Sequence, residues 1–363
     1  MKNILICPLD WGMGHATRVR SIAYRLHDQG HNVIVAASES LLGVFDESVC
    51  TEKVIFNSLR VRYSKRLPAY LVVFLQAPLL VLQFLSDRYR TGRLVKKHGI
   101  DIVISDNRFG CRSGKAFSVY ITHQLSIKLP GRTALLARIL SAIHRRIAAG
   151  YDECWIPDVE DGLAAELTAH GDRLKARYTG ILSMLDTCEE LRPEGFPWGT
   201  YYAVIISGPE PQRGLLEEKL MARLSGTAER FVFAAGNIAG SGFGLRGSRD
   251  NIWYYSCLGA GEMKYVLGHS KGVICRGGYS TLMDLVVLGK GAIVVPTPGQ
   301  TEQEYLAGEL DARGWVKQYK QHEIDDLDTG KLPDPKSFGT IKEESGVLLD
   351  KALWELISLS SSR

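Results

Sequence analysis

The chain has 363 residues, 45% hydrophobic and 23% charged, which suits a globular protein of two domains and excludes a low-complexity chain. Its seven cysteines stand singly without a Cys-x-x-Cys pair, which predicts free thiols in a reducing cytosol and argues against a zinc site or a disulfide framework. The opening "MKNILICPL" predicts a buried strand followed by a turn, not a secretory signal. We therefore expect a cytoplasmic protein.

The net charge of +4 hides an uneven distribution along the chain. Residues 53–151 contain 18 Lys and Arg but only three acids, Asp87, Asp101 and Asp106, a net charge of +15. The remainder carries −11. A segment this basic attracts anions, so we expect it to meet lipid headgroups, phosphates or nucleic acid.

Short apolar runs alternate with helical patterns along the whole chain. In the first half, strands are expected at 3–9, 32–38, 101–107 and 118–124, and in the second at 201–208, 230–236, 252–257, 272–278 and 292–298. Near-continuous apolar runs followed by turn residues are typical of parallel strands that are covered on both faces. Helices such as 281–289 and 303–314 lie between them. The pattern predicts an α/β chain of two Rossmann-like, doubly wound domains in series.

A stretch rich in Pro, Gly and charge marks the expected domain boundary. We expect an N-terminal domain at 1–185, a linker at 186–199, a C-terminal domain at 200–342, and a C-terminal helix at 343–363.

Two segments of the basic region depart from the ordinary α/β pattern. Residues 67–85 carry no charge, have Pro78 in the middle, and are flanked by Arg and Lys on both sides. Residues 132–147 place a set of apolar residues on one helical face: Leu135, Leu136, Ile139, Leu140, Ile143 and Ile147. Both segments could be helices packed on the sheet, or they could form a surface that dips into the membrane interface. A transmembrane span is disfavoured, because it would interrupt the α/β alternation.

The turn "WGMGH" follows the first strand and contains Gly12 and Gly14. Glycines at that point let the backbone approach a ligand and open a helix whose free N–H groups favour negative charge. A dinucleotide-binding fingerprint would need a third Gly or Ala where this chain has Thr17. Glu39, after the second strand, could be a ribose-binding acid, so an NAD-dependent enzyme stays a minor alternative.

His15, in the same turn, is the expected general base. An imidazole there can remove a proton from an attacking hydroxyl at neutral pH, provided that a carboxylate fixes its tautomer. Asp106 ends another strand at the same carboxyl edge, whereas Asp10 is nearer in sequence but less well placed. His123 also ends a strand and could contact the acceptor, with Gly12 and Gly14. The competing interpretation is that His15 only caps the turn and Asp106 only caps a helix.

The second half contains a glycine loop at the start of a helix, "RGGYST". Its N–H groups and hydroxyls can hold phosphate oxygens. The residues concerned are Gly277, Gly278, Tyr279, Ser280 and Thr281, with Asp284 one turn further on to accept from ribose hydroxyls. Gln303 and Glu304, after the next strand, could bind sugar hydroxyls. Arg213 could contact a diphosphate bidentately, and Arg276 is a second candidate for that charge. Each of these loops alone would be interpreted as an ordinary turn, but several such loops at the carboxyl ends of strands favour a nucleotide site.

These residues resemble the nucleotide-sugar glycosyltransferases of the GT-B fold, family 28, which include the N-acetylglucosaminyltransferase that forms lipid II. The resemblance covers the "GMGH" turn and residues 259–306. It implies that Gly259, Ala260 and Met263 line a uracil base, that Asp284 binds ribose, and that the family's paired glutamines fall on Gln303 and Glu304. Glutamate at 304 is a departure that leaves the donor sugar open.

The pairing of His15 with Asp106 is similar to the His–Asp dyad of plant UDP-sugar transferases, which share the fold. The resemblance also implies inversion at the anomeric carbon, no cofactor and no bound metal, and a C-terminal helix that packs back on the first domain.

The sequence thus predicts a metal-independent, inverting glycosyltransferase that moves a sugar from a UDP-sugar to a hydroxyl acceptor. The acceptor is expected to be lipid-linked or otherwise anionic, and the protein cytoplasmic, with peripheral attachment to an anionic inner membrane face and a cell-envelope role. Alternatives are a UDP-sugar epimerase or hydrolase of the same fold, and a non-catalytic subunit that recruits a transferase to the membrane. A nucleic-acid partner is disfavoured, because the basic region is interleaved with aliphatic residues instead of stacking aromatics.

Overall fold

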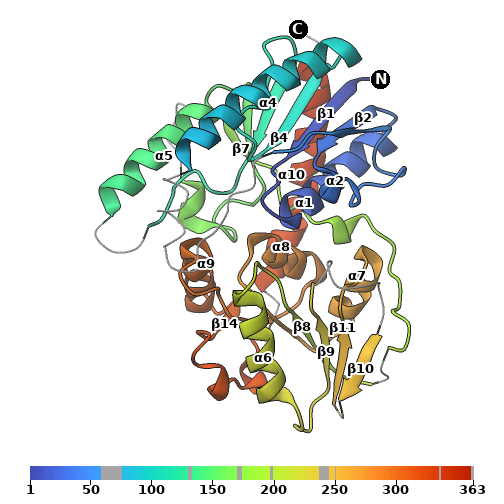
Figure 1. The fold of residues 1–363 in the computed structure, drawn as a ribbon, viewed down its shortest axis with the longest axis vertical. Helices are drawn as coiled ribbons and strands as arrows, with labels where there is room; N and C mark the ends of the chain where they lie inside the picture. The colour runs from blue at the N-terminus through green and yellow to red at the C-terminus, as the bar shows by residue number, and fades with distance from the viewer. Residues whose placement is uncertain are drawn as a thin grey trace. The chain divides into compact units, whose positions relative to one another are not determined.

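The computed structural model describes residues 1–58, 76–129, 133–169, 174–196, 199–236, 245–249, 251–334 and 337–360. Two compact units make up the chain. The first contains Met1–Met184 together with Ile341–Arg363, and the second contains Leu185–Thr340. Each unit is described below by itself (Figure 1).

The first unit is built on a seven-stranded sheet in the order β3-β2-β1-β4-β5-β6-β7, and all of its pairings are parallel. Its strands are β1 (Asn3–Pro8), β2 (Asn32–Ala37), β3 (Glu52–Ile55), β4 (Ile102–Asp106), β5 (Phe117–Ile121), β6 (Glu153–Ile156) and β7 (Ala176–Tyr178). β1 lies between β2 and β4 and is buried over most of its length, because the two faces of its sheet are both covered.

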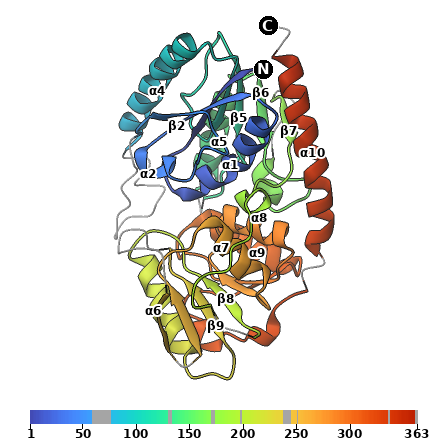
Figure 2. The ribbon, with the colours of Figure 1, turned by 90° about the vertical axis from the view of Figure 1, so that its right-hand side faces the viewer.

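Helices cover the two faces of this sheet: α1 (Met13–Asp28), α2 (Glu39–Leu42), α4 (Ala77–His98), α5 (Ala134–Ala148) and part of α10 (Ser337–Leu359). Figure 2 shows α4 and α10 on opposite faces. Alternate residues of β1 point to opposite faces, so Leu5 and Cys7 pack in one cluster with Val95 of α4. α10 is tied to this unit by Arg25, whose Nη1 lies 2.9 Å from Asp350 Oδ1.

The second unit contains a sheet in the order β10-β11-β9-β8-β12-β13-β14. Its strands are β8 (Tyr202–Ile205), β9 (Phe231–Ala234), β10 (Leu245–Arg249), β11 (Ile252–Tyr255), β12 (Val273–Cys275), β13 (Ala292–Val294) and β14 (Val316–Gln318). Only the edge pair β10–β11 is antiparallel among the described pairings. Its helices are α6 (Gln212–Leu224), α7 (Ala260–Gly268), α8 (Tyr279–Leu288) and α9 (Thr301–Ala312). Leu216, Leu220 and Leu224 of α6 pack against strand residues such as Val204 and Phe233.

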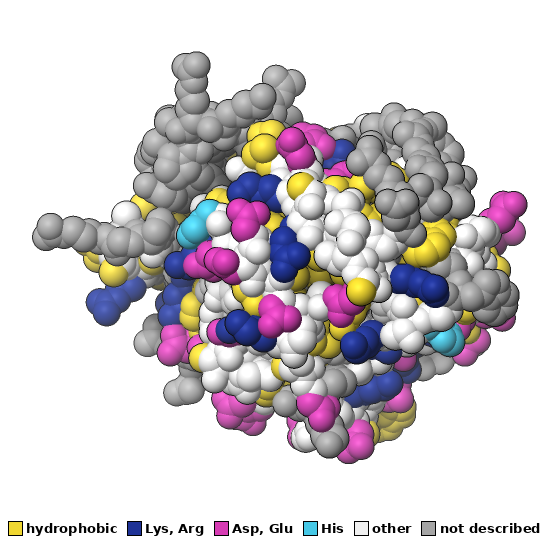
Figure 3. All heavy atoms as spheres, turned by 90° about the horizontal axis from the view of Figure 1, so that it is seen from below, with side chains coloured by type: hydrophobic (Ala, Val, Ile, Leu, Met, Phe, Trp, Pro, Cys, Tyr) yellow, Lys and Arg dark blue, Asp and Glu magenta, His cyan; other side chains and the backbone are white. Residues whose placement is uncertain are grey.

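Short 3₁₀ turns complete the chain at Ala165–Thr168, Met184–Asp186, Ile324–Asp326 and Thr329–Lys331. On the face drawn in Figure 3, acidic and basic side chains lie next to one another.

The predicted fold class is confirmed, since both units are α/β with doubly wound, mainly parallel sheets. Five strands were not predicted: β3, β6, β7, β10 and β14. β3 and β7 contain charged residues and no buried position, so they lack the apolar run that predicted the others. β6 is fully buried, and its short run was missed.

The structure describes part of the two unusual segments of the basic region. Of the uncharged stretch 67–85, residues 67–75 lie outside the described residues, and the rest begins α4. In α5 the buried positions are Ser141, His144 and Ala148, whereas Leu135, Ile139 and Ile143 are exposed. Half of the predicted apolar face of α5 is thus exposed, whereas Leu136, Leu140 and Ile147 are half-buried. In the part of the chain that the structure describes, no helix is both long and apolar enough to span a bilayer.

Candidate functional site

In each sheet the strand order reverses direction at one point, and the candidate site residues follow the strands at these points. In the first sheet this point lies between β1 and β4, whose last residues, Pro8 and Asp106, are partners in the register. In the second it lies between β8 and β12, where Ile205 pairs with Cys275. Open parallel sheets bind ligands outside the carboxyl ends of the strands at such a switch point, because the two following loops diverge to opposite faces there.

At the first switch point, α1 begins at Met13, so Gly14 and His15 lie in its first turn. Gly12 precedes the helix and has no side chain that could cap it, which leaves the first N–H groups unsatisfied by the helix itself. The His15 side chain is 20% exposed and Asp106 is fully buried. His15 Nδ1 lies 3.2 Å from Asp106 Oδ2. The structure thus brings together the two residues that were predicted as a base and its carboxylate.

Sequence reasoning missed Arg18, which belongs to the same cluster. Arg18 is 2% exposed, and its Nε donates to Asp106 Oδ2 at 2.7 Å while its Nη2 donates to Asp106 Oδ1. Nη2 also lies 3.0 Å from His15 Nδ1. The signal was available, since residues three apart on a helix share a face and Arg18 follows His15 by three. Asp106 therefore serves a buried arginine as well as the histidine.

The protonation states in this cluster follow from burial and from the two neighbouring charges. Burial lowers the pKa of His15 below its ordinary value; Asp106 opposes this shift and the positive charge of Arg18 adds to it. Burial alone would raise the pKa of Asp106, but Arg18 and His15 together bring it below its ordinary value. At neutral pH the arrangement therefore holds a carboxylate, a guanidinium and a neutral imidazole, which is the form that can accept a proton.

The remaining predicted residues of the first unit are placed less directly. His123 is 6% exposed, and its Nδ1 lies 3.3 Å from Arg18 Nη1. It therefore contacts the buried side of the cluster and has little contact with solvent. Asp10 is buried as well, but Asp106 is the carboxylate that lies within 3.2 Å of His15. Gly12 is exposed and Gly14 half-buried.

At the second switch point, α8 begins at Tyr279, directly after Gly278. Gly278 offers no side-chain cap, and the first turn, Tyr279–Thr281, contains no acidic residue. N–H groups in the first turn of a helix can bind an anion, and the helix dipole favours it. Ser280, Thr281 and Asp284 are half-buried, whereas Tyr279 is buried.

The two glycines before α8 have different reasons to be glycine. A Cβ on Gly277 would lie 3.1 Å from Val294 Cγ1 and 3.3 Å from the Gln303 carbonyl oxygen, so packing requires its absence. A Cβ on Gly278 would meet only Thr281 Oγ1, at 3.9 Å. Packing therefore explains Gly277 but not Gly278, whose missing side chain leaves the start of α8 open.

The two arginines predicted to contact a diphosphate are both engaged within the protein. Arg213, in the first turn of α6, pairs with Glu210 through its Nε at 2.9 Å and donates to the Ala235 carbonyl. Arg276 is 1% exposed and donates to the carbonyls of Val295, Pro296 and Gln212. Arg276 thus links the loop after β13 to the start of α6, and its contact with a diphosphate stays a prediction.

The predicted base and sugar contacts lie at the start of two other helices. Gly259, Ala260 and Met263 are half-buried around the start of α7, where the Gly259 N–H donates to Glu262 Oε2 at 2.8 Å. Gln303 and Glu304 lie on α9 and contact the loop before it. Gln303 Oε1 accepts from the Thr297 N–H, and Glu304 Oε1 accepts from the Gly299 N–H, each at 2.9 Å. These side chains fix the shape of the loop, and Glu304 is exposed.

Comparison with known proteins adds a domain match and a fold match. Residues 248–332 match the glycosyltransferase family 28 C-terminal domain. This range contains the α8 and α9 loops described above. The fold and the matched domain are those of a GT-B glycosyltransferase. No curated protein sequence matches the chain significantly.

Solved structures similar to the chain cover nearly its whole length at low identity. The glycosyltransferase SnogD from Streptomyces nogalater is 15% identical, with a TM-score of 0.65 over 99% of this chain and 100% of its own. The calicheamicin glycosyltransferase CalG4 is 12% identical, with a TM-score of 0.65 over 100% and 99%. The spinosyn rhamnosyltransferase SpnG, solved with thymidine diphosphate, is 14% identical, with a TM-score of 0.62 over 95% and 96%. The predicted GT-B fold and glycosyltransferase class are thus confirmed, while the specific resemblance to the lipid II-forming enzyme is not supported beyond the domain family.

Proposed function

We propose that this glycosyltransferase moves a sugar from a nucleoside diphosphate sugar to a hydroxyl acceptor, with inversion and with His15 as the general base. The observation that carries the proposal is the partly exposed His15, held within 3.2 Å of the fully buried Asp106 at the carboxyl edge of the first sheet. A neutral imidazole in that position is the group that can activate a hydroxyl.

The tautomer of His15 decides whether this chemistry is possible. If Nδ1 carries the hydrogen and donates to Asp106, the lone pair of Nε2 is available as the base. If Arg18 Nη2 instead donates to Nδ1, Nε2 is protonated and cannot act. Because Arg18 already donates to both oxygens of Asp106, it holds the carboxylate in place and offsets its charge. We therefore propose Arg18 as a positioning residue for the base.

In the proposed reaction, the acceptor oxygen forms a bond to the anomeric carbon as His15 Nε2 takes its proton. The bond from the anomeric carbon to the diphosphate oxygen breaks, and its electron pair leaves with the diphosphate. The N–H groups at the start of α8 would stabilise this growing negative charge, which explains why the turn lacks an acidic residue. Asp284 would accept from the ribose hydroxyls, and the loop held by Gln303 and Glu304 would contact the sugar. We propose that no bound metal is needed, so activity should survive a chelator.

The base of the donor is proposed to be uracil, with thymine as the competitor. The resemblance of residues 259–263 to the family's base-binding segment favours uridine, whereas the similar structure of SpnG was solved with thymidine diphosphate. Thermal stabilisation distinguishes them, since a ligand at 100 times its Kd stabilises the folded state by about 2.7 kcal/mol. UDP should stabilise the chain more than dTDP at equal concentration.

The acceptor is proposed to be lipid-linked and to be met at an anionic membrane surface. α4 and α5 expose a set of large apolar side chains: Leu79, Val81, Leu82, Leu85, Tyr89, Leu135, Ile139 and Ile143. Exposed Arg88, Arg93, Lys96, Lys97, Arg138 and Arg146 belong to the same two helices. Apolar groups that insert, together with cations that meet anionic headgroups, are the two components of interfacial binding.

Replacement of the proposed base tests the catalytic part of this proposal. His15→Ala should lower turnover at least ~100-fold, because a positioned general base contributes about 10²–10⁴-fold, while UDP binding stays within about twofold. His27→Ala, on the same helix, is the matched control and should leave turnover unchanged. Normal turnover by His15→Ala would remove His15 from the mechanism.

Flotation with liposomes tests the membrane part independently. Leu82→Glu and Leu135→Glu should each weaken binding to anionic vesicles, because a carboxylate cannot enter the interface as leucine does. Val347→Glu, at an equally exposed apolar position on α10, should float like the unmodified protein. If the unmodified protein fails to float at low salt, the acceptor is not met at a membrane.

A further inference from the structure

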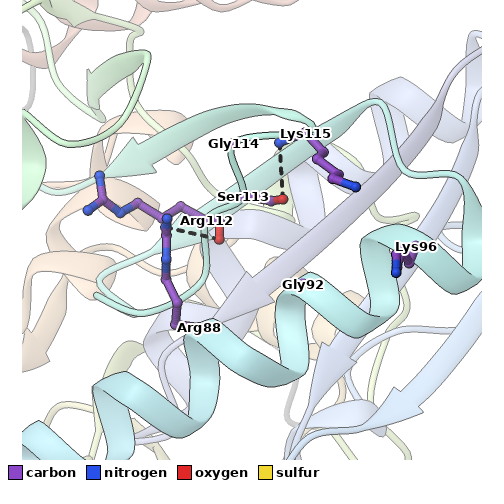
Figure 4. A pocket seen from close by; sticks show the side chains of 7 residues that line it. All are labelled: Arg88, Gly92, Lys96, Arg112, Ser113, Gly114 and Lys115. Atoms are coloured by element: carbon purple, nitrogen blue, oxygen red, sulfur yellow. Dashed lines mark hydrogen bonds between the residues drawn. The ribbon is translucent and has the colours of Figure 1, made fainter.

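A strongly basic pocket lies beside α4, on the first unit and apart from the cluster of His15. Its volume is about 310 Å³, and it is lined by Arg88, Gly92, Lys96, Arg112, Ser113, Gly114 and Lys115. Figure 4 shows the first three on α4 and the other four on the loop that faces it. The lining thus contains four cations, and none of the described residues that line it is acidic.

The three carboxylates of the basic segment itself are engaged elsewhere. The basic segment 53–151 contains only three acids. Asp87 forms a buried bidentate pair with Arg108, at 2.9 and 3.0 Å. Asp106 is bound by Arg18, and Asp101 Oδ2 accepts from the Asn3 N–H at 2.8 Å. Within the described part of the chain, Arg88, Lys96, Arg112 and Lys115 form no ion pair.

The cations are also held close to one another despite their like charge. Arg88 Nη1 donates to the Arg112 carbonyl at 3.3 Å, and Arg112 Nη1 donates to the Gly150 carbonyl. Arg112 Nε is buried without a hydrogen-bond partner. Burial, with a further contribution from the charge of Arg112, lowers the pKa of Arg88. Like charges placed together are unfavourable, and an anion between them would relieve that cost.

The floor of the pocket is a glycine in the interior of α4. Gly92 follows Arg88 by four residues and precedes Lys96 by four, so the three lie on one side of the helix. A Cβ at Gly92 would meet nothing within 4 Å, so no packing contact requires glycine there. Glycine in a helix interior costs roughly 0.5–1 kcal/mol relative to alanine. What the missing side chain provides is space between the cations.

We propose that this pocket binds a phosphate group carrying at least two negative charges, either as a free phosphorylated compound or as a lipid headgroup. Lys96 and Lys115 supply mobile point charges from opposite walls, and Arg88 a donor fork. The inference does not depend on the proposed function, because it concerns binding alone and needs neither a sugar donor nor an acceptor.

Two probes distinguish the sources of the phosphate. Inorganic pyrophosphate is titrated calorimetrically into the full chain with UDP present in excess, so that a nucleotide site is occupied. In parallel, flotation is measured with two kinds of vesicle at matched surface charge. One contains phosphatidic acid, whose headgroup is a phosphate monoester, and the other contains phosphatidylglycerol, whose headgroup is a phosphate diester. Pyrophosphate binding supports a soluble ligand, and a preference for phosphatidic acid supports a headgroup. The absence of both overturns the proposal.

Matched variants show whether the pocket is responsible. Lys96→Ala with Lys115→Ala changes two exposed side chains, so folding is preserved, and it should weaken binding of the phosphate probe at least ~10-fold, about 1.4 kcal/mol. The control, Lys53→Ala with Lys342→Ala, removes the same charge from exposed positions outside the pocket and should change binding less than about twofold. Equal losses in both would mean that only net charge matters and would overturn the proposal.

A charge-neutral variant separates space from electrostatics. Gly92→Leu keeps all four cations but fills the floor, and it should abolish the binding that Gly92→Ala largely preserves. Because alanine and leucine both favour helix over glycine, neither variant should destabilise α4. Unchanged affinity in Gly92→Leu would show that the anion is held elsewhere.

Discussion

The switch points of the two sheets have the same strand topology but are equipped in opposite ways. At the first, the chemistry comes from side chains: Asp106 is buried and holds Arg18 and His15 by hydrogen bonds. At the second, it comes from the backbone: α8 starts after Gly278, which has no side chain that could cap the first N–H groups. The difference shows how one topology supplies two functions. A proton acceptor needs a tuned side chain, whereas an anion needs only aligned N–H dipoles.

The largest effect is expected from removing the buried arginine of the first switch point. Arg18→Met would remove the guanidinium from the buried Asp106 and leave it beside the neutral His15, which should cost about 3–5 kcal/mol of folding free energy. Turnover should fall ~100-fold, because His15 loses its fixed orientation. Chemical denaturation and steady-state kinetics measure the two effects.

Arg20→Met is the matched control for Arg18→Met. Arg20 is also buried on α1, but its partner Asp46 is largely exposed, so water can solvate the carboxylate that is left behind. The Arg20→Met protein should therefore lose less folding free energy than the Arg18→Met protein, and its turnover should be unchanged. Equal effects of the two variants would show that Arg18 has only a structural role.

At the second switch point, the two glycines should separate stability from donor binding. Gly277→Ala should destabilise the chain by about 1–3 kcal/mol, because its Cβ would crowd Val294 and the Gln303 backbone. Gly278→Ala should leave the melting temperature nearly unchanged and weaken UDP binding about tenfold, because its methyl group would stand over the start of α8. If both variants bind UDP as tightly as the unmodified protein, the diphosphate site is not at α8.

A smaller effect is expected where the chain departs from the family pattern. Glu304→Gln should fold normally, because an amide oxygen can still accept from the Gly299 N–H. An amide can also donate, so the ranking of donor sugars should change several-fold, on the order of 1 kcal/mol. An unchanged ranking across a panel of UDP-sugars would place residue 304 outside the sugar contact.

The smallest change should appear in the pH dependence of kcat/KM. Because burial and Arg18 lower the pKa of His15 while Asp106 opposes them, the neutral base persists below pH 6.5. The acid limb of the profile should therefore lie below that value, and in Arg18→Met it should move to higher pH. The neighbouring charge of His123 acts in the same direction as Arg18. An acid limb above 6.5 in the unmodified protein would contradict this assignment.

Much of the first site could be predicted, because parallel strands bring their carboxyl ends to one edge. This rule places His15 near Asp106 although 90 residues separate them in the chain. It does not reveal which side of α1 faces Asp106, so no role was predicted for Arg18. The burial of Arg276 could not be predicted for a related reason: arginine is usually exposed, and its carbonyl partners at 212 and 295–296 are far apart in the chain until it folds.

The sequence by itself determined the two α/β units, most of their central strands and the residues at the switch points, because hydrophobic periodicity and glycine turns are local signals. Tertiary structure alone decided the short strands such as β3 and β14, which exist through pairing with a neighbour. It also decided that α5 buries Ser141 and His144 and exposes Leu135, Ile139 and Ile143 of its apolar face. An amphipathic pattern states that a helix has two faces, but only the packing partners determine which face is covered.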